Sequence, residues 1–272
     1  YHNDCEYSDF RFSSNARYAT SSTTISVPTS PVGTDGNTTA YYPFDNAGIF
    51  DKTGNNALAL AGNTSTSTTQ TKFADTAMYF DGNEDRLQIN NNSLLNLGTA
   101  DFTIECWVYS TTPLGNYTID YAHIAGKGNA VDASTYALGF YQSKIYFAIG
   151  GTGDGQGATT LTHNTWYHFA VTWDKANSQK QIFINGESIG STSTFTDFDG
   201  VGYFYIGNTR SVERDWNGDI DEVRIWNVAR TKVQILADMN KELCSIPSSL
   251  KAYYTFNQGI ASGSNTGLTN LN

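Results

Sequence analysis

The 272-residue chain carries little charge, and the charge it has is mostly of one sign. Only 15% of its residues are charged, with 16 Lys and Arg against 26 Asp and Glu, for a formal net charge of −10. Binding to a phosphate backbone rests on clustered Lys and Arg, so this balance argues against a nucleic-acid partner. The acidic residues are dispersed along the chain, which is typical of a hydrated protein surface rather than of an acidic tail.

Long apolar runs are also missing. No stretch of about 18 apolar residues occurs, so the sequence predicts no membrane-spanning helix. No secretory signal is recognisable, and the chain opens abruptly at Tyr1, as a processed or trimmed product would. The good helix formers Lys and Glu are scarce, whereas Ser, Thr, Asn, Gly and Tyr are abundant. This composition favours strands and turns over a helical bundle.

Cysteine is scarce, with three residues in the chain. Cys106 lies in the segment FTIECWV on the same strand face as Ile104 and Val108, so we expect it to be a small buried core residue. Cys5 and Cys244 lie near the two ends of the chain. They could form a disulfide in an oxidising compartment or remain two thiols, because sequence alone does not test their geometry.

The motifs of familiar hydrolases are absent. There is no E-x-D-x-x-E strand motif, which would put three carboxylates on one face for two-carboxylate glycoside hydrolysis. The nearest segment, DIDEVR, lacks both Glu positions. No G-x-S-x-G or H-E-x-x-H motif occurs, and the four His are scattered, so that we expect His168 to have a structural role. The sequence therefore predicts no catalytic site.

Strand patterns dominate the chain from about residue 40 onward. WYHFAVTWD (Trp166–Asp174) alternates, with Tyr167 and Phe169 on the apolar face and His168 on the other. QIFINGESIG (Gln181–Gly190) folds around Asn-Gly, which is the strongest short-range hairpin signal. Many such strands separated by turn-rich loops are typical of a sandwich or a barrel.

One helix is predicted, over Thr231–Met239. Thr231 and Gln234 match a capping box, in which each side chain bonds the backbone of the other residue. Val233, Leu236 and Met239 recur at helical spacing, so we expect them to form the buried face and the helix to cap one end of the sandwich.

The two ends of the chain differ from its middle. Residues 1–39 contain a Ser/Thr-rich run and two prolines, which we interpret as an extended arm or linker before a domain over 40–272. The segment AYYPFDN (Ala40–Asn46) recurs as AYYTFNQ (Ala252–Gln258). Residues 251–272 are then either the final strand of this domain with a tail, or the start of a following module. We favour the first, because an apolar strand is costly to leave unpaired.

Six motifs, in order, resemble the laminin-G-like group of concanavalin A-like jelly rolls, in its bacterial and pentraxin-related branch. They cover about residues 40–256 and read YYPFDN, AMYFDGNEDRLQI, DFTIECWV, WYHFAVTWD, IFINGE and WNGDIDEVRIWNVAR. The resemblance implies an all-β, two-sheet antiparallel jelly-roll sandwich with one short helix near the C-terminus. It also implies a secreted or cell-surface protein, often with bound calcium. It leaves the ligand open, because this fold serves many functions.

The resemblance also implies a calcium site. In related domains the ion bridges the first strand, the turn after the F-D-G strand and an Asp of the late strand, which here are Asp45, the backbone near Asp81 and Gly82, and Asp221. The alternation slips in GDIDEVRIW, which predicts a β-bulge at Asp221 and Glu222 that would re-aim these side chains. The alternative is that the Asp residues serve turns through their own hydrogen bonds.

Sugar binding by such modules uses aromatic stacking together with polar side chains. Tyr141, Tyr203 and Tyr205 alternate away from the inferred core and are the candidate aromatic contacts, and Arg210 is the candidate polar contact. The tryptophans are instead expected in the core, because they lie in motifs where related domains keep an aromatic residue: Trp107, Trp166, Trp173, Trp216 and Trp226.

These observations predict a non-catalytic extracellular module that binds a glycan, such as a cell-surface or matrix polysaccharide, or mediates adhesion, with a structural calcium. The alternative is a structural subunit of a surface filament or coat. Its arm and end strands would pair with other copies or with neighbouring modules of a larger protein. A glycan-active enzyme is the least favoured function.

Overall fold

The computed structural model describes residues 10–15, 35–42, 49, 51–73, 76–98, 100–113, 121–128, 136–141, 144–149, 152–155, 161–192, 202–208 and 215–258. The chain divides into two compact units, Tyr1–Ala47 and Gly48–Asn272, rather than after residue 39. In the first unit, β1 (Phe10–Ser13) pairs antiparallel with β2 (Thr38–Tyr42). Ala40–Tyr42, the described part of the segment expected to open the sandwich, thus lies in the second strand of this hairpin.

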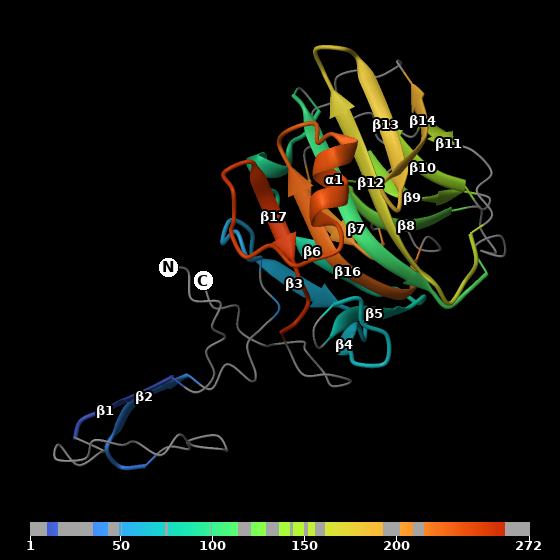
Figure 1. The fold of residues 1–272 in the computed structure, drawn as a ribbon. Helices are drawn as coiled ribbons and strands as arrows, with labels where there is room; N and C mark the ends of the chain where they lie inside the picture. The colour runs from blue at the N-terminus through green and yellow to red at the C-terminus, as the bar shows by residue number, and fades with distance from the viewer. Residues whose placement is uncertain are drawn as a thin grey trace. The chain divides into compact units, whose positions relative to one another are not determined.

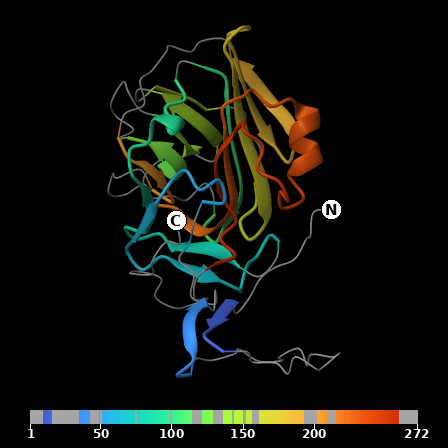
Figure 2. The same ribbon diagram turned by 90° about the vertical axis from the view of Figure 1, so that its left-hand side faces the viewer.

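The second unit is a sandwich of two antiparallel sheets (Figures 1 and 2). The seven-stranded sheet has the order β11 (Thr152–Gly155), β10 (Lys144–Ile149), β9 (Tyr136–Tyr141), β8 (Tyr121–Lys127), β15 (Phe204–Ile206), β6 (Arg86–Ile89) and β3 (Leu58–Ala61). The eight-stranded sheet has the order β14 (Glu187–Thr192), β13 (Gln179–Ile184), β12 (Trp166–Asp174), β7 (Phe102–Ser110), β16 (Asn217–Trp226), β5 (Ala77–Asp81) and β4 (Ser65–Ser67), with β17 (Leu250–Tyr254) also paired to β16. The predicted jelly-roll sandwich is confirmed.

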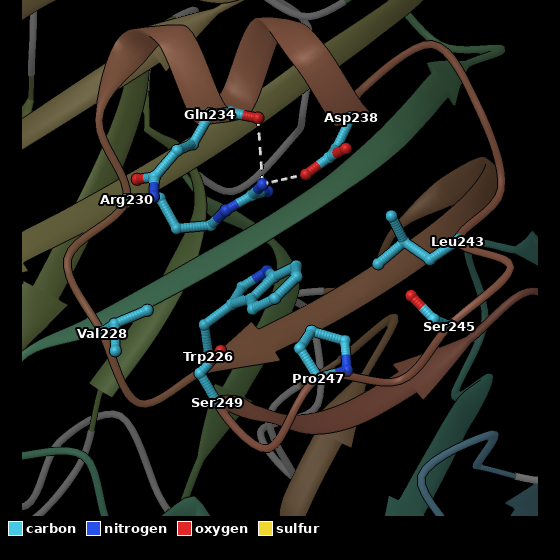
Figure 3. Close-up of a pocket in the computed structure, with 9 residues that line it drawn as sticks. All are labelled: Trp226, Val228, Arg230, Gln234, Asp238, Leu243, Ser245, Pro247 and Ser249. Atoms are coloured by element: carbon cyan, nitrogen blue, oxygen red, sulfur yellow. Dashed lines mark hydrogen bonds and ion pairs between the residues drawn. The ribbon is translucent and has the colours of Figure 1, made fainter.

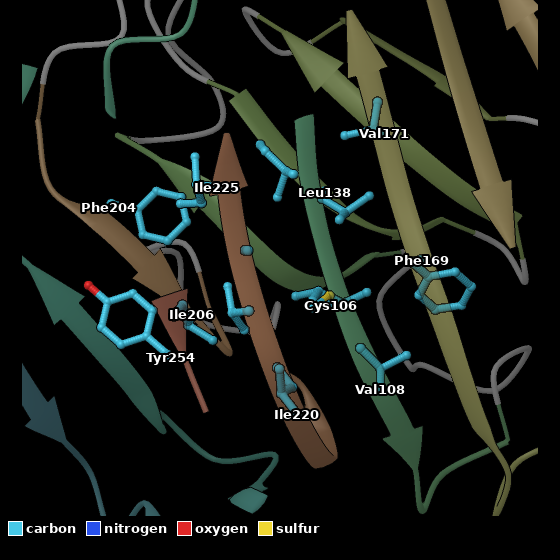
Figure 4. Close-up of a cluster of buried hydrophobic side chains, with 14 of the residues drawn as sticks. Cys106, Val108, Leu138, Phe169, Val171, Phe204, Ile206, Ile220, Ile225 and Tyr254 are labelled. Carbon is cyan, nitrogen blue, oxygen red and sulfur yellow. The ribbon is translucent and has the colours of Figure 1, made fainter. Parts of the chain in front are cut away.

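The core fills the space between the sheets because the strands alternate as predicted (Figure 4). On β7, Ile104, Cys106 and Val108 face the core and are at most 2% exposed, which confirms Cys106 as a buried core residue. Phe169 and Val171 of β12 lie beside them. We call the opposite side of each sheet its outer face.

The strand β16 contains the predicted bulge. Asp221 is opposite Trp107 and Arg224 is opposite Glu105 on β7, so β16 has one extra residue between these pairs. Glu222 adopts a φ of 55°, a left-handed conformation that is uncommon outside glycine. Before the bulge β16 pairs with β5, and after it with β17. The second copy of the AYY segment therefore forms a strand of the same sandwich, the last one among the described residues.

The helix α1 (Lys232–Asp238) begins at the predicted capping box, with Thr231 as N-cap and Gln234 as its partner. It packs on the outer face of the eight-stranded sheet through Ile235 and Met239, which contact Trp107 and Phe183. Figure 2 shows α1 on the side of this sheet that faces away from the other sheet.

Of the three residues expected on the helix's buried face, Met239 is buried, and the prediction was wrong for Val233 and Leu236. Val233 is 75% exposed and Leu236 is 39% exposed, whereas Ile235 is fully buried. The Trp107 indole donates a hydrogen bond to the carbonyl of Met239 at 2.6 Å, and this contact helps to set the helix's rotation. No helix in the part of the chain that the structure describes is long and apolar enough to cross a membrane.

A buried polar network joins α1 to the sheet. Arg230 donates to Glu105 Oε1 at 2.6 Å and to the Gln234 carbonyl at 2.9 Å, and it pairs with Asp238. Trp226 Nε1 donates to the same Glu105 oxygen at 2.8 Å. Burial and the nearby cations lower the pKa of His168 to about 3, so the imidazole stays neutral beside this network. This is the structural role expected for His168.

Replacing Arg230 with Met should lower the free energy of unfolding by about 3 kcal/mol, because it leaves the buried Glu105 carboxylate without its cation. The matched control is Lys232→Met, which removes an exposed ion pair with Glu187 and should cost less than about 1 kcal/mol. Urea denaturation followed by tryptophan fluorescence measures both. Equal losses in the two variants would show that the network does not anchor α1.

Candidate ligand-binding site

Part of the outer face of the eight-stranded sheet carries a row of side chains that crosses four neighbouring strands. Asp219 of β16 is directly opposite Tyr79 of β5 on one side and Tyr109 of β7 on the other. Tyr109 is in turn opposite Trp166 of β12. We call Tyr79, Asp219, Tyr109 and Trp166 the aromatic row. Three steps between strands give it a length of about 14 Å.

Strand alternation places the whole row on the outer face. Phe80, Val108 and Ile220, which adjoin Tyr79, Tyr109 and Asp219 along their strands, belong to the core between the sheets. The three aromatic residues are half-buried, so each ring keeps some exposed surface. The rings of Tyr109 and Trp166 lie 5.6 Å apart between centroids and are tilted by 51°. The row therefore offers apolar ring surface at three of its four positions.

The fourth position is a buried carboxylate. Asp219 is 2% exposed, and its Oδ1 atom has no hydrogen-bond partner among the described residues. Burial raises the pKa of Asp219 to about 7. Burial also raises the pKa of Tyr79, and the carboxylates of Asp81, Asp219 and Asp85 add to this shift. An unsatisfied buried acceptor costs about 1–3 kcal/mol. The Oδ1 atom is enclosed by its neighbours, so a ligand hydroxyl recovers this cost by displacing them.

Residues 71–73 border the row on the side toward α1. The backbone N–H of Lys72 donates to Asp221 Oδ2 at 3.3 Å, and its ammonium lies 3.5 Å from the centre of the Trp107 ring. Phe73 meets the same indole edge-on at 6.2 Å. Residues 71–73 therefore cover Trp107 and Asp221, and the aromatic row lies next to them.

The other border of the row is polar. Thr111 Oγ1 donates to Asn217 Oδ1, and the backbone N–H of Asn164 donates to the Ser110 carbonyl at 2.8 Å. Asn217 is half-buried and precedes Asp219 by two positions, so it lies on the same face of β16. The row thus combines apolar rings, one unsatisfied carboxylate oxygen and a polar margin, which is the mixture that polar ligands with apolar faces require.

The residues predicted to contact the ligand are not brought together at this site. Tyr203 is 42% exposed and Tyr205 is 2% exposed, and their rings lie 6.1 Å apart on the outer face of the seven-stranded sheet. Their direction away from the core was correctly predicted, but Tyr205 is covered and offers no open ring. Tyr141 ends β9, and its side chain is not among those described. Arg210 lies outside the described residues.

The predicted calcium ligands do not form one site either. Asp45 lies outside the described residues. Asp81 is opposite Asn217, four positions before Asp221 on β16, or about 13 Å along a strand. Calcium binds its ligands at about 2.3–2.6 Å, so two ligands of one ion lie within about 5 Å of each other. Among the described residues, no group of three or more His, Cys, Asp or Glu is placed to hold a metal.

The carboxylates of this set accept hydrogen bonds from N–H groups. Asp221 is 1% exposed and accepts the N–H groups of Lys72 and Glu222. Burial, with the charge of Glu222 beside it, raises the pKa of Asp221 well above its usual value. Asp81 accepts the N–H of Asn83 at 2.8 Å, which is the turn role considered as the alternative. The bulge directs Glu222 to Arg224 and Tyr253 instead of to a metal.

Gly82 is explained by its turn. Its φ is +84°, and a Cβ atom there would lie 2.9 Å from Asn217 Nδ2. Any larger residue would be strained and would displace that amide. The other predicted pair, Cys5 and Cys244, is untested: Cys244 is exposed with a free thiol, and Cys5 lies outside the described residues.

A pocket of about 310 Å³ lies between α1 and the chain that follows it, over the Trp226 indole (Figure 3). The Arg230 guanidinium stacks on this indole, 4.2 Å from the ring centre, and is held by Gln234 and Asp238. The remaining wall consists of Val228, Leu243, Ser245, Pro247 and Ser249. Because its charged groups already bind each other, this pocket has less to offer a ligand than the aromatic row.

Sequence reasoning missed the aromatic row, although the signal was present. Trp166 was assigned to the core, yet it lies two positions from His168 on the same strand and so points to the same face. His168 was correctly predicted to face outward. Tyr79 and Tyr109 likewise alternate with core residues of their own strands. Strand parity alone would have placed all three rings on one face. Their alignment into one row required the registers of four strands.

Comparison with known proteins agrees with the architecture. Residues 81–236 match the profile of the family described as the concanavalin A-like lectin/glucanases superfamily. A search of curated proteins gave no significant match. Among solved structures, domain 4 of AbnA, a GH43 extracellular arabinanase from Geobacillus stearothermophilus in complex with arabinotriose, is similar with 19% identity and a TM-score of 0.54. That match covers 71% of this chain and 94% of the other.

Two toxin domains are also similar. The binding domain of Paraclostridial Mosquitocidal Protein 1 has 13% identity and a TM-score of 0.54, and covers 68% of this chain. The ligand binding domain of botulinum neurotoxin serotype D, in complex with N-acetylneuraminic acid, has 11% identity and a TM-score of 0.53, and also covers 68%. The matches cover 47% and 46% of those two chains, so this chain resembles about half of each. At these identities the likeness shows the fold.

The raised pKa of Asp219 predicts how stability depends on pH. The folded carboxyl titrates near pH 7 and the unfolded one near pH 4, so the folded state binds more protons between these values. Stability should therefore fall as the pH rises through this window. Asp219→Asn cannot ionise and so does not lose stability in this window. The free energy of unfolding of the variant minus that of wild type should therefore rise by roughly 1–4 kcal/mol from pH 4 to pH 8.

Urea denaturation at a series of pH values checks this prediction. Asp174→Asn is the matched control, because hydrogen bonds from Asn177 lower the pKa of the native Asp174 carboxyl. The difference in free energy of unfolding between this control and wild type should reach its full value by about pH 5 and stay constant up to about pH 8. A parallel pH dependence in the two variants would contradict the assignment of an ionisation cost to Asp219.

Proposed function

The chain belongs to the concanavalin A-like lectin/glucanases superfamily, and we propose that it is a carbohydrate-binding module. The observation that carries the proposal is the aromatic row, with three half-buried rings in register across four strands around the unsatisfied carboxylate of Asp219. Sugar rings have apolar faces that stack on aromatic rings and hydroxyl groups at their edges that hydrogen-bond. The row supplies both kinds of contact within one strip of surface.

The similar structures support this proposal. The arabinanase domain was solved with arabinotriose and the botulinum neurotoxin domain with N-acetylneuraminic acid, so two similar folds were solved with saccharides. The arabinanase is extracellular. We propose the same location for this chain, secreted or at the cell surface, where it would attach its parent protein or cell to a polysaccharide and so contribute to adhesion.

We propose further that the module is not catalytic. Asp219 and Asp221 lie two positions apart on one strand face, about 7 Å between Cα atoms, which is near the carboxylate spacing of glycosidases. However, burial raises the pKa of both carboxyls. A two-carboxylate mechanism needs one ionised partner and one protonated partner, with pKa values pushed apart. Asp221 is also covered by residues 71–73, so the pair cannot flank a bound sugar.

Binding through the aromatic row predicts that Trp166→Ala and Tyr109→Ala each weaken binding to a polysaccharide. A tenfold loss corresponds to about 1.4 kcal/mol, the size expected for one aromatic contact. Affinity electrophoresis against a panel that includes linear arabinan measures the change, and titration calorimetry quantifies it for the polysaccharides that bind.

The control for this experiment is Tyr203→Ala, which removes an exposed ring from the other sheet and should leave binding unchanged. Loss of binding in Tyr203→Ala with full binding in Trp166→Ala would show that the site lies on the seven-stranded sheet instead. No retention by any polysaccharide would refute the proposed function. Assays for new reducing ends on the same panel test the absence of catalysis.

A structural calcium stays a prediction, confined to Asp45, Asp81 and Gly82 because Asp221 is occupied by N–H donors. If the ion is bound there, calcium should raise the melting temperature relative to chelator, and Asp81→Asn should abolish that rise. Scanning calorimetry with calcium and with chelator measures it. Equal melting temperatures in the two conditions would remove calcium from the description of this module. Repeating the polysaccharide panel in chelator then separates stability from binding.

A further inference from the structure

We propose that the aromatic row binds an uncharged, hydroxyl-rich glycan chain laid across the strands, and that Asp219 selects this class by accepting hydrogen bonds from hydroxyl groups of the sugar above it. The inference rests on the proposed function and goes beyond it by naming the ligand class, the course of the chain and the residue that determines specificity. Three observations carry it: the order of side chains along the row, the unsatisfied oxygen of Asp219 and the signs of the surrounding charges.

The order of the row determines the course of the chain. Tyr79 lies on one side of Asp219, and Tyr109 and Trp166 lie on the other, each one strand further along. Successive strands are about 4.8 Å apart, which is close to the length of one sugar residue in an extended chain. A chain laid across the strands can therefore stack on a ring at either side while one residue sits over the carboxylate.

The carboxylate sets which groups can sit above it. Above about pH 7 Asp219 is ionised and is an acceptor only, and its Oδ1 has no donor among the residues that the structure describes. A hydroxyl group supplies the missing donor, whereas a carboxylate or sulfate on the ligand brings only further acceptors. A buried polar group that is left unpaired discriminates strongly against ligands that cannot pair with it.

The surrounding charges favour the same class. Asp81 lies one strand away from Asn217, on the same outer face as Asp219. Lys72 is the cation beside the row, but its ammonium lies on the Trp107 ring next to Asp221. An acidic sugar would therefore meet the carboxylate of Asp81 and, above about pH 7, that of Asp219, whereas an uncharged sugar would not be repelled.

The test uses two polymers that share a backbone and differ in charge: polygalacturonic acid and its methyl ester. Above pH 7, where Asp219 is ionised, wild type should bind the ester at least about tenfold more tightly than the acid, as expected for one unpaired charged contact. Asp219→Asn, which nearly preserves the shape, should weaken binding of the ester and reduce the ratio between the two polymers. Glu187→Gln is the matched control, because it removes one exposed carboxylate far along the sheet and should leave the ratio unchanged.

The length of the chain gives a second readout. Across a ladder of linear arabino-oligosaccharides, affinity should stop rising at about four residues, one for each position of the row. Trp166→Ala should move this plateau to a shorter oligosaccharide, because it removes the ring at one end.

The outcomes separate this inference from the proposed function. If neutral polymers bind through Trp166 while the acid binds as tightly as the ester, or Asp219→Asn leaves the ratio unchanged, the inference fails and the module remains a carbohydrate-binding one. If no polymer binds wild type, both fail. Circular dichroism and a cooperative unfolding transition for Asp219→Asn ensure that a change in ratio reports on binding.

Discussion

The single extra residue in β16 determines how the outer face of the eight-stranded sheet is divided. Before the bulge, Asp219 is in register with β7 and β5 and Asp221 with β7, and after it Arg224 and Trp226 are in register with β7 and β17. Without the bulge, strand alternation would turn Val223 and Ile225 outward and Arg224 into the core. The extra residue keeps both halves of the strand correctly oriented while giving them different strands as neighbours.

The two halves handle buried charge in opposite ways. Beyond the bulge, each buried carboxylate has a cation: Glu222 pairs with Arg224, and Glu105 pairs with Arg230 under α1. Before the bulge, Asp221 is satisfied by backbone N–H groups, and Asp219 keeps an oxygen without a partner. The helix therefore covers the half in which the buried carboxylates have cations. The aromatic row occupies the half in which Asp219 has neither a cation nor a donor at Oδ1 among the described residues.

Local patterns predicted the features that depend on neighbours in sequence. These include the buried face of β7 with Cys106, the capping box at Thr231, and the bulge at Asp221. Features that depend on distant contacts were missed. Asp221 was expected to bind a metal because its N–H donor, Lys72, lies 149 positions earlier in the chain and local sequence does not reveal this contact. Tyr205 resembled an open ring, since strand parity shows the face of a residue but not what covers that face.

An ionisable group kept in a costly environment argues for a function that needs it. At the position of Asp219 an apolar or amide side chain would avoid burying an unpaired oxygen, and the fold would be more stable near neutral pH. Proteins retain such local conflicts mainly at functional sites. The aromatic residues that flank Asp219 cannot supply the missing hydrogen bond at Oδ1, but they can hold a ligand that does. We therefore propose that the buried carboxylate and the stacking surface of the rings belong to one binding site.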